Sequence, residues 1–317
     1  MGYRLRYQSK SWATHHVVSR CVQGCHLLKP TPEILSKMTG VLGRALHVYG
    51  SHIQLHAYVF LSNHFHLLIS SETSGALSEF MKYLKGNLTR ELNHIHNRSG
   101  AMWQSRYSSE EILDQESYDG LFKYLTENSV KEGLVDHPQE WVGLHSYHQL
   151  IEGKSISGPW LDRTALREAQ RSTHSRGRAT QAHFTKLYQV KLSRSPFWMY
   201  LSEQEHYERC VELTRVAVEN ARLKRGKKVS IGMDNVLAAR VDEPRPIKKR
   251  GRRSLCHAHF FEVRFVYRLI YQSFKAKYQE MYRALRDGLL DDHSCLSSYF
   301  PEGGVPPLGI CSLIQRE

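Results

Sequence analysis

Long apolar runs are missing from this 317-residue chain. No stretch reaches the roughly 18 apolar residues that a membrane-spanning helix needs, so no such helix is expected. The first residues, Met1-Gly2-Tyr3-Arg4-Leu5-Arg6, also lack the apolar segment of a signal peptide. The sequence therefore predicts a cytoplasmic protein without a membrane partner.

Cysteine is scarce and irregularly spaced. The six cysteines form neither a disulfide framework nor a pair of CxxC motifs for zinc. Cys21, Cys25 and His26 resemble half of a metal site, but no second half follows nearby. We expect all six to be reduced thiols, as in a cytosolic protein. No internal repeat is present either, which excludes solenoid folds.

What the chain has is positive charge, with a formal net charge of +13. Residues 1–150 are almost neutral, with 14 Lys and Arg against 13 Asp and Glu, whereas residues 151–317 carry 30 against 18. Two dense basic runs lie at 222–228 and 248–253. Such runs favour contact with nucleic acid, and solvated surface segments are the alternative.

The most informative motif is His64-Phe65-His66, which follows the turn signal Ser62-Asn63 and reads as a β-strand. Residues two apart in a strand point to the same face, so both imidazoles are expected to project together while Phe65 enters the core. Two convergent imidazoles on a rigid strand are suited to hold a divalent metal. A pair of solvated histidines is the alternative.

Other histidine pairs lack this context. His94 and His96 lie in an expected helix, where residues two apart diverge. The pair at 257 and 259 follows a basic run and shows no strand periodicity, and adjacent His15 and His16 face opposite ways in a strand.

A second candidate site lies on an expected helix from Ser117 to Val130. Tyr124 and Asn128 are four residues apart and so share one helical face. The amide oxygen could be a third metal ligand and the phenol a nucleophile. Tyr83 and Asn87 have the same spacing on an earlier helix, so spacing alone does not choose between the two pairs.

The chain resembles the single-tyrosine HUH transposases, and most closely the REP-associated tyrosine transposases. The resemblance covers the first 150 or so residues and is carried, in chain order, by His16-Val17-Val18-Ser19-Arg20, His56-Ala57-Tyr58-Val59, Asn63-His64-Phe65-His66-Leu67-Leu68, Arg98-Ser99-Gly100-Ala101-Met102-Trp103-Gln104-Ser105-Arg106-Tyr107, Lys123-Tyr124 through Asn128-Ser129-Val130-Lys131-Glu132-Gly133-Leu134-Val135, and Ser146-Tyr147-His148. In that family the nucleophile lies one turn before the amide ligand, which selects Tyr124 over Tyr83. The family usually has proline where this chain has Ser129, a difference that we interpret as structural because proline there would only end the helix.

The resemblance implies a mechanism. His64, His66 and Asn128 would hold Mg²⁺ or Mn²⁺, although the ligand types alone do not exclude zinc. Tyr124 would attack a phosphate of single-stranded, hairpin-forming DNA. The product would be a 5′-phosphotyrosine and a free 3′-hydroxyl. Candidate DNA contacts are Arg20, Arg106, Lys131, Lys248, Lys249, Arg250, Arg252 and Arg253.

The expected fold is α+β. The elements are a strand near 14–22, a helix at 31–49, strands at 53–61 and 65–70, a helix at 76–97, a strand near 105–113 and the helix that carries Tyr124. The order β-α-β-β-α-β-α is typical of a ferredoxin-like antiparallel sheet with helices on one face, with the Tyr124 helix packed across the strand of His64 and His66.

We expect a catalytic domain at 1–152, a linker at 153–180, and a mostly helical, basic region for DNA binding at 181–317. Helical patterns occur near 163–172, 183–192, 202–225 and 259–286, and 233–246 resembles a loop. The aromatic residues of the last helix fit a core stripe better than a base-stacking surface, which is the alternative.

Three functions fit these patterns: a DNA strand transferase that uses Tyr124, a nucleic-acid-binding protein of the same fold without strand transfer, and a metal-dependent phosphodiesterase that uses water. The sequence leaves open whether Tyr124 completes the site of its own chain or that of a partner chain in a homodimer.

Overall fold

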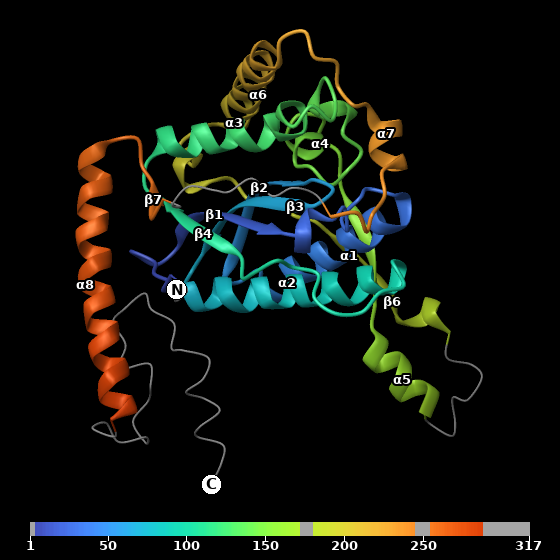
Figure 1. Cartoon of the computed structure of the whole chain (residues 1–317), viewed down its shortest axis with the longest axis horizontal. Coiled ribbons are helices and arrows are strands. Elements are labelled where there is room, and N and C mark those ends of the chain that lie inside the picture. Colours follow the sequence, from blue (N-terminus) through green and yellow to red (C-terminus); the bar gives the residue numbers. More distant parts are fainter. Residues whose placement is uncertain (1–3, 172–179, 245–253, 288–317) are drawn as a thin grey trace.

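A computed structural model describes residues 4–171, 180–244 and 254–287 (Figure 1). Its strands and helices are β1 (Ala13–Arg20), α1 (Pro32–Tyr49), β2 (Ile53–Phe60), β3 (His64–Ser71), α2 (Ser74–Ile95), β4 (Ser108–Ile112), α3 (Gln115–Lys131), α4 (Tyr147–Leu150), β5 (Ser157–Leu161), α5 (Arg163–Arg171), β6 (Thr185–Gln189), α6 (Glu203–Arg225), α7 (Met233–Ala238), β7 (Cys256–His257) and α8 (Phe261–Arg286). Short 3₁₀ helices are η1 (Val22–Gly24), η2 (Pro138–Glu140), η3 (Gln181–Phe184) and η4 (Pro196–Trp198). None of the described helices is long and apolar enough to cross a membrane.

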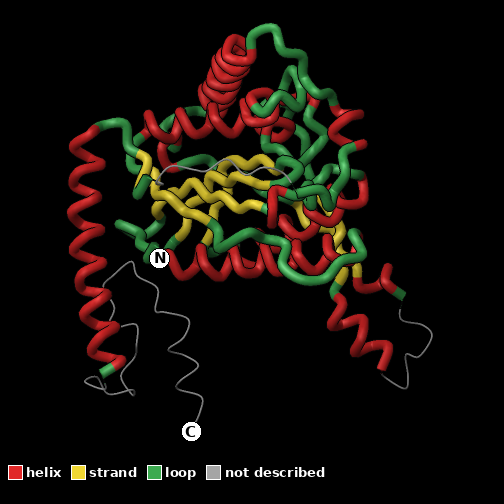
Figure 2. Tube along the Cα trace, in the orientation of Figure 1, coloured by secondary structure: helices red, strands yellow, loops and turns green. Residues whose placement is uncertain are grey.

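A five-stranded sheet in the order β2-β3-β1-β4-β7 is the centre of the fold. Its pairs are antiparallel except β4 with β7. Figures 1 and 2 show α2 below this sheet and α3 above it. The predicted α+β class and the order β-α-β-β-α-β-α are confirmed. Helices α1 and α2 cover one face as expected, and α3 packs across the other.

Strand alternation gives the sheet two cores. Phe65, Leu67 and Ile69 of β3 pack with α1 and α2. Leu68 belongs to the opposite core, with Phe122 and Leu125 of α3. The helix starts are fixed locally: Asp114 caps α3 by accepting a hydrogen bond from the Ser117 amide at 2.9 Å, as expected of an N-cap residue. These two cores hold α3 over the face to which His64 and His66 point.

The expected linker at 153–180 contains strand β5 and helix α5. Strand β5 pairs with β6, and this two-stranded sheet packs on α1. The approach is close, because a Cβ atom on Gly40 would lie 2.0 Å from the carbonyl oxygen of Pro159. The helix expected at 183–192 is therefore wrong. Pairing with β5, a tertiary contact, selects a strand for that segment.

The C-terminal part also differs in detail from expectation. Residues 233–238 form the short helix α7 instead of a loop. Residues 256–257, for which no strand was expected, form β7 because β4 offers a free edge for pairing. The basic run at 248–253 lies outside the described residues.

Helix α8 runs beside the edge of the sheet (Figure 1). Four of its aromatic side chains, Tyr267, Tyr271, Phe274 and Tyr278, form a core with Tyr7. The interpretation as a core stripe holds for these four. Phe260, Phe261, Phe265 and Tyr282 are exposed.

Candidate active site

Two buried imidazoles form the base of the candidate site. His64 and His66 lie on β3, between β2 and β1, and are 4% and 2% exposed. Their ring centroids are 5.1 Å apart. Phe65 lies between them in sequence and is buried in the core on the other face. The projection expected from the strand period is therefore observed.

Hydrogen bonds orient both rings. Nδ1 of His64 lies 2.6 Å from the side-chain oxygen of Asn63, and Nδ1 of His66 lies 2.9 Å from Nε2 of His16. Since Nδ1 is used in each ring, Nε2 is the nitrogen that each can offer to a cation. Metal-binding histidines are commonly fixed in this way by a partner on the second nitrogen.

Helix α3 brings Tyr124 to the same place. The centroid of its ring lies 5.2 Å from that of His66, and the two planes meet at 77°. The alternative pair is excluded by its position: Tyr83 lies on α2, beyond the opposite face of the sheet, where it packs against Tyr49 and Trp160. Tyr124, and not Tyr83, therefore lies beside the two imidazoles of β3.

Asn128 follows Tyr124 by one turn and is fully buried. Within the described residues, neither its side-chain oxygen nor its side-chain nitrogen has a hydrogen-bond partner. A buried amide without a partner costs about 1–3 kcal/mol. Such a cost is typical of a group that serves a ligand, and an amide oxygen beside two imidazoles is a donor set that fits a divalent cation.

Lys131 lies on the rim of this site. Its ammonium nitrogen is 4.4 Å from the centroid of the Tyr124 ring and 3.7 Å from a carboxylate oxygen of Glu127. Burial raises the pKa of Glu127, an effect that the nearby charge of Lys131 opposes. The lysine therefore places positive charge beside the phenol.

The other expected DNA contacts are dispersed. Arg20 ends β1 directly opposite His64 and thus borders the site. Arg106 does not: it donates a hydrogen bond to the carbonyl oxygen of Arg4 and lines a separate cavity of about 330 Å³ that Leu77 of α2 also lines. Lys248, Lys249, Arg250, Arg252 and Arg253 lie outside the described residues.

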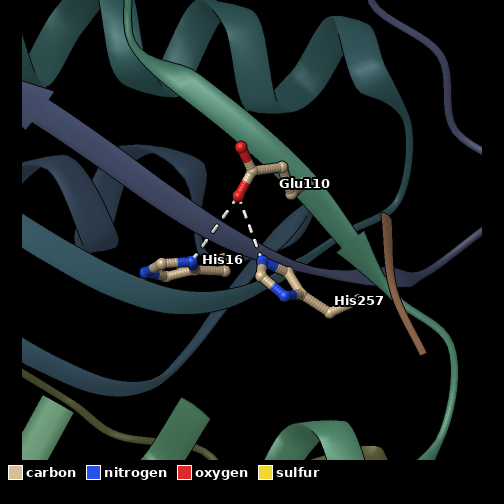
Figure 3. Close-up of side chains that lie close together, drawn as sticks. All are labelled: His16, Glu110 and His257. Carbon is tan, nitrogen blue, oxygen red and sulfur yellow. Dashed lines mark hydrogen bonds and ion pairs between the residues drawn. The ribbon is translucent and has the colours of Figure 1, made fainter. Parts of the chain in front are cut away.

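A further cluster beside the site was not expected from the sequence. The carboxylate of Glu110 lies 3.0 Å from Nε2 of His257 and 3.9 Å from Nδ1 of His16 (Figure 3). His257 reaches it because β7 pairs with β4, and Glu110 lies opposite His16 across β4 and β1. The sequence held no local signal for this cluster, since its members are about 90 and 150 residues apart along the chain.

The arrangement combines three chemical functions. Two imidazoles and an amide can bind a cation, a phenol can act as a nucleophile, and an ammonium group can neutralise an anion.

Comparison with known proteins gives one family match and two similar solved structures. Residues 31–128 match the family model described as "Transposase IS200 like", a range that contains His64, His66, Tyr124 and Asn128. No curated protein sequence matches the chain. The predicted resemblance to transposases is confirmed over the matched range.

Two solved structures are similar to parts of the chain. One is described as "Structure of the REP associates tyrosine transposase bound to a REP hairpin"; it has 20% identity and a TM-score of 0.37, and the alignment covers 47% of this chain and 84% of that chain. The other is a candidate transposase from Deinococcus radiodurans R1, with 19% identity, a TM-score of 0.28, and coverage of 40% and 97%. At such TM-scores only the family match supports a functional assignment.

Proposed function

We propose that this protein, whose residues 31–128 belong to the IS200-like transposase family, cleaves and rejoins single-stranded, hairpin-forming DNA through Tyr124. The observation that carries the proposal is the position of the Tyr124 ring, 5.2 Å from the ring of His66 on the sheet face that bears both buried imidazoles. A phenol with a purely structural role would not require beside it two imidazoles and an amide that has no partner in the described part of the chain.

The donor set fits the cation that the family resemblance implies. His64 and His66 offer imidazole nitrogens, and the side-chain oxygen of Asn128 is buried without a hydrogen-bond partner among the described residues. Mg²⁺ or Mn²⁺ held by these three residues would supply Lewis-acid polarisation of a scissile phosphate.

Tyr124 performs the covalent step. Its hydroxyl oxygen attacks phosphorus and loses its proton, while the bond from phosphorus to the 3′-oxygen breaks and that oxygen leaves as a 3′-hydroxyl. The DNA downstream of the cut stays attached through a 5′-phosphotyrosine bond. Because this bond retains the energy of the phosphodiester, a 3′-hydroxyl can reverse the reaction without a nucleotide cofactor.

Lys131 and Arg20 provide charge around this step. The ammonium group of Lys131 lies over the phenol ring, where it stabilises negative charge that develops on the phenol oxygen and on the phosphate. Arg20, opposite His64, is placed to contact a DNA phosphate. The excess charge of residues 151–317 would bind flanking DNA, so that the first part of the chain cuts and the second part holds the substrate.

An adduct assay tests the proposal. The protein is incubated with hairpin oligonucleotides from sequences that flank its gene, labelled at the 5′ or the 3′ end, in Mn²⁺ or Mg²⁺. The products are then separated on a denaturing gel. We expect a protein adduct that carries the label downstream of the cut.

Cleavage without an adduct would overturn the covalent step and favour a phosphodiesterase that uses water. Tight, salt-sensitive binding without cleavage, for every oligonucleotide tried, would favour the alternative of a nucleic-acid-binding protein on this fold.

A further inference from the structure

We propose that His16, Glu110 and His257 form a binding site for a transition-metal ion, with Zn²⁺ as the best fit, separate from the site of His64, His66 and Asn128. One ligand atom from each residue lies within 4.8 Å of the others. Figure 3 shows both imidazoles directed at the same carboxylate, at 3.0 Å from His257 and 3.9 Å from His16. An ion with ligands about 2 Å away holds donor atoms at separations of this order.

The donor types specify the class of ion. Two imidazoles and one carboxylate are a typical zinc ligand set that leaves a position for water, and they also suit iron, cobalt and nickel. Mg²⁺ and Ca²⁺ prefer oxygen donors, so we expect this cluster to bind Zn²⁺ more tightly than either of them.

The three side chains are held in place before any ion arrives. They come from three adjacent strands, β1, β4 and β7, so the backbone limits their movement. Their side chains are 8%, 12% and 26% exposed for His16, Glu110 and His257, which shields the carboxylate and leaves access from the side of His257. A preorganised, partly shielded donor set binds metal more tightly than solvated residues do.

Binding at this cluster would also attach the C-terminal part of the chain to the sheet. Strand β7 pairs with β4 through only two residues, and His257 is the second of them. Four positions before it, the basic run ends at Arg253. A metal ion joining His257 to β1 and β4 would therefore fix the segment that follows this run.

The cluster touches the proposed active site through one hydrogen bond, between Nε2 of His16 and Nδ1 of His66. If Nδ1 of neutral His16 binds an ion, the proton of His16 is on Nε2, which then donates to Nδ1 of His66. The proton of His66 must then be on its own Nε2, the nitrogen that would otherwise bind the first cation. Occupancy of the cluster therefore weakens binding at the first site, by about 10-fold or more if the usual effect of such partners applies. This consequence rests on the proposed function, whereas the cluster itself does not.

Zinc binding by the full-length, metal-stripped protein tests the proposal, measured by competition with a chromophoric chelator. His257→Ala and the isosteric Glu110→Gln are each expected to weaken Zn²⁺ binding at least tenfold. His259→Ala is the matched control, because His259 is exposed and lies two residues further on, with its ring against Phe260. It should bind Zn²⁺ like the unchanged protein, whereas His64→Ala should keep the Zn²⁺ that binds at His16, Glu110 and His257.

Two results would overturn the proposal: unchanged Zn²⁺ affinity in Glu110→Gln, or loss of Zn²⁺ binding in His64→Ala but not in His257→Ala. The second would place Zn²⁺ at the first site. Neither of these two Zn²⁺-binding results predicts the outcome of the adduct assay in Mn²⁺. A failure of this proposal can therefore be distinguished from a failure of the proposed function.

Discussion

The phenol ring of Tyr124 stands nearly perpendicular to the imidazole of His66, with the ring centroids 5.2 Å apart. The two residues come from a helix and a strand 58 positions apart in the sequence, and the packing of α3 on the sheet brings them together.

Replacement of Tyr124 by phenylalanine removes only the hydroxyl oxygen. We expect Tyr124→Phe to lose adduct formation and cleavage by at least 100-fold while its Mn²⁺ and DNA affinities stay within about twofold, since neither cation ligand nor basic residue changes. The adduct gel and a filter-binding titration measure the two properties. Tyr83→Phe, the matched control on α2, should keep full activity. Residual adduct in Tyr124→Phe would show that another residue is the nucleophile.

One chain supplies both Tyr124 and His66, so the site is expected to act without a partner subunit. A mixture of Tyr124→Phe and His64→Ala proteins should form no more adduct than either variant alone. Adduct recovered in the mixture would mean that two chains share one site, with the tyrosine of one acting at the histidines of the other.

The Asn128→Leu substitution tests whether Asn128 contributes to metal binding independently of its effect on stability. Leucine has a similar size but no polar atoms, so it removes a buried amide that lacks a partner among the described residues. We expect urea unfolding of the metal-free variant to show stability equal to or about 1 kcal/mol above that of the unchanged protein, while Mn²⁺ affinity falls at least tenfold. Asn87→Leu is the control, because Asn87 donates a hydrogen bond to the carbonyl oxygen of Tyr83 and should not alter Mn²⁺ affinity. Unchanged Mn²⁺ affinity in Asn128→Leu would remove Asn128 from the ligand set.

The basic run at 248–253 is predicted to contact DNA phosphates. With Lys248, Lys249, Arg250, Arg252 and Arg253 changed to glutamine, the affinity for single-stranded DNA should fall. The slope of log affinity against log salt should become shallower by up to about 3.5, at about 0.7 for each lost contact. Changing the exposed Lys186 and Lys191 instead should leave the slope almost unchanged. An unaltered slope after the five changes would assign the run to a solvated segment.

Buried histidines, among them His15 and His56, make stability depend on pH. Burial lowers the pKa of both His15 and His56 to about 4. In the unfolded chain each has a pKa near 6.5, so at pH 5 the unfolded state binds a proton that the folded state does not. The contribution of each histidine to the free energy of unfolding is fully present above its unfolded pKa of about 6.5 and is lost as the pH falls toward 4. The loss is about 2 kcal/mol per histidine between pH 7.5 and 5.

Urea unfolding at pH 7.5 and 5.0 measures this loss. His56→Gln should reduce the difference between the two conditions by about 2 kcal/mol, because the imidazole at this position is removed. An equal pH dependence in His56→Gln and the unchanged protein would contradict the assignment.

Much of the N-terminal fold could be read from the sequence because its signals are local. The alternation around Phe65 predicted β3, and the capping residues Thr31 and Asp114 mark the starts of α1 and α3. The spacing of Tyr124 and Asn128 predicted that they share a helix face. Local pattern could not separate this pair from Tyr83 and Asn87, and only the family resemblance did so.

The C-terminal part was less predictable because its structure depends on distant partners. Residues 185–189 form β6 by pairing with β5, and His257 is on a strand because β4 has an edge to pair with. In neither segment does the local sequence contain a strand period.

By itself, the sequence determined which side chains share a face: side-chain direction repeats every two residues in a strand and about every 3.6 in a helix, so His64 with His66 and Tyr124 with Asn128 follow from spacing alone. The tertiary structure decided which faces meet. It placed Tyr124 over His66, and it brought His257 to Glu110 and His16, which precede it in the chain by about 150 and about 240 residues. Such contacts depend on the packing of whole elements against one another, and no local pattern encodes them.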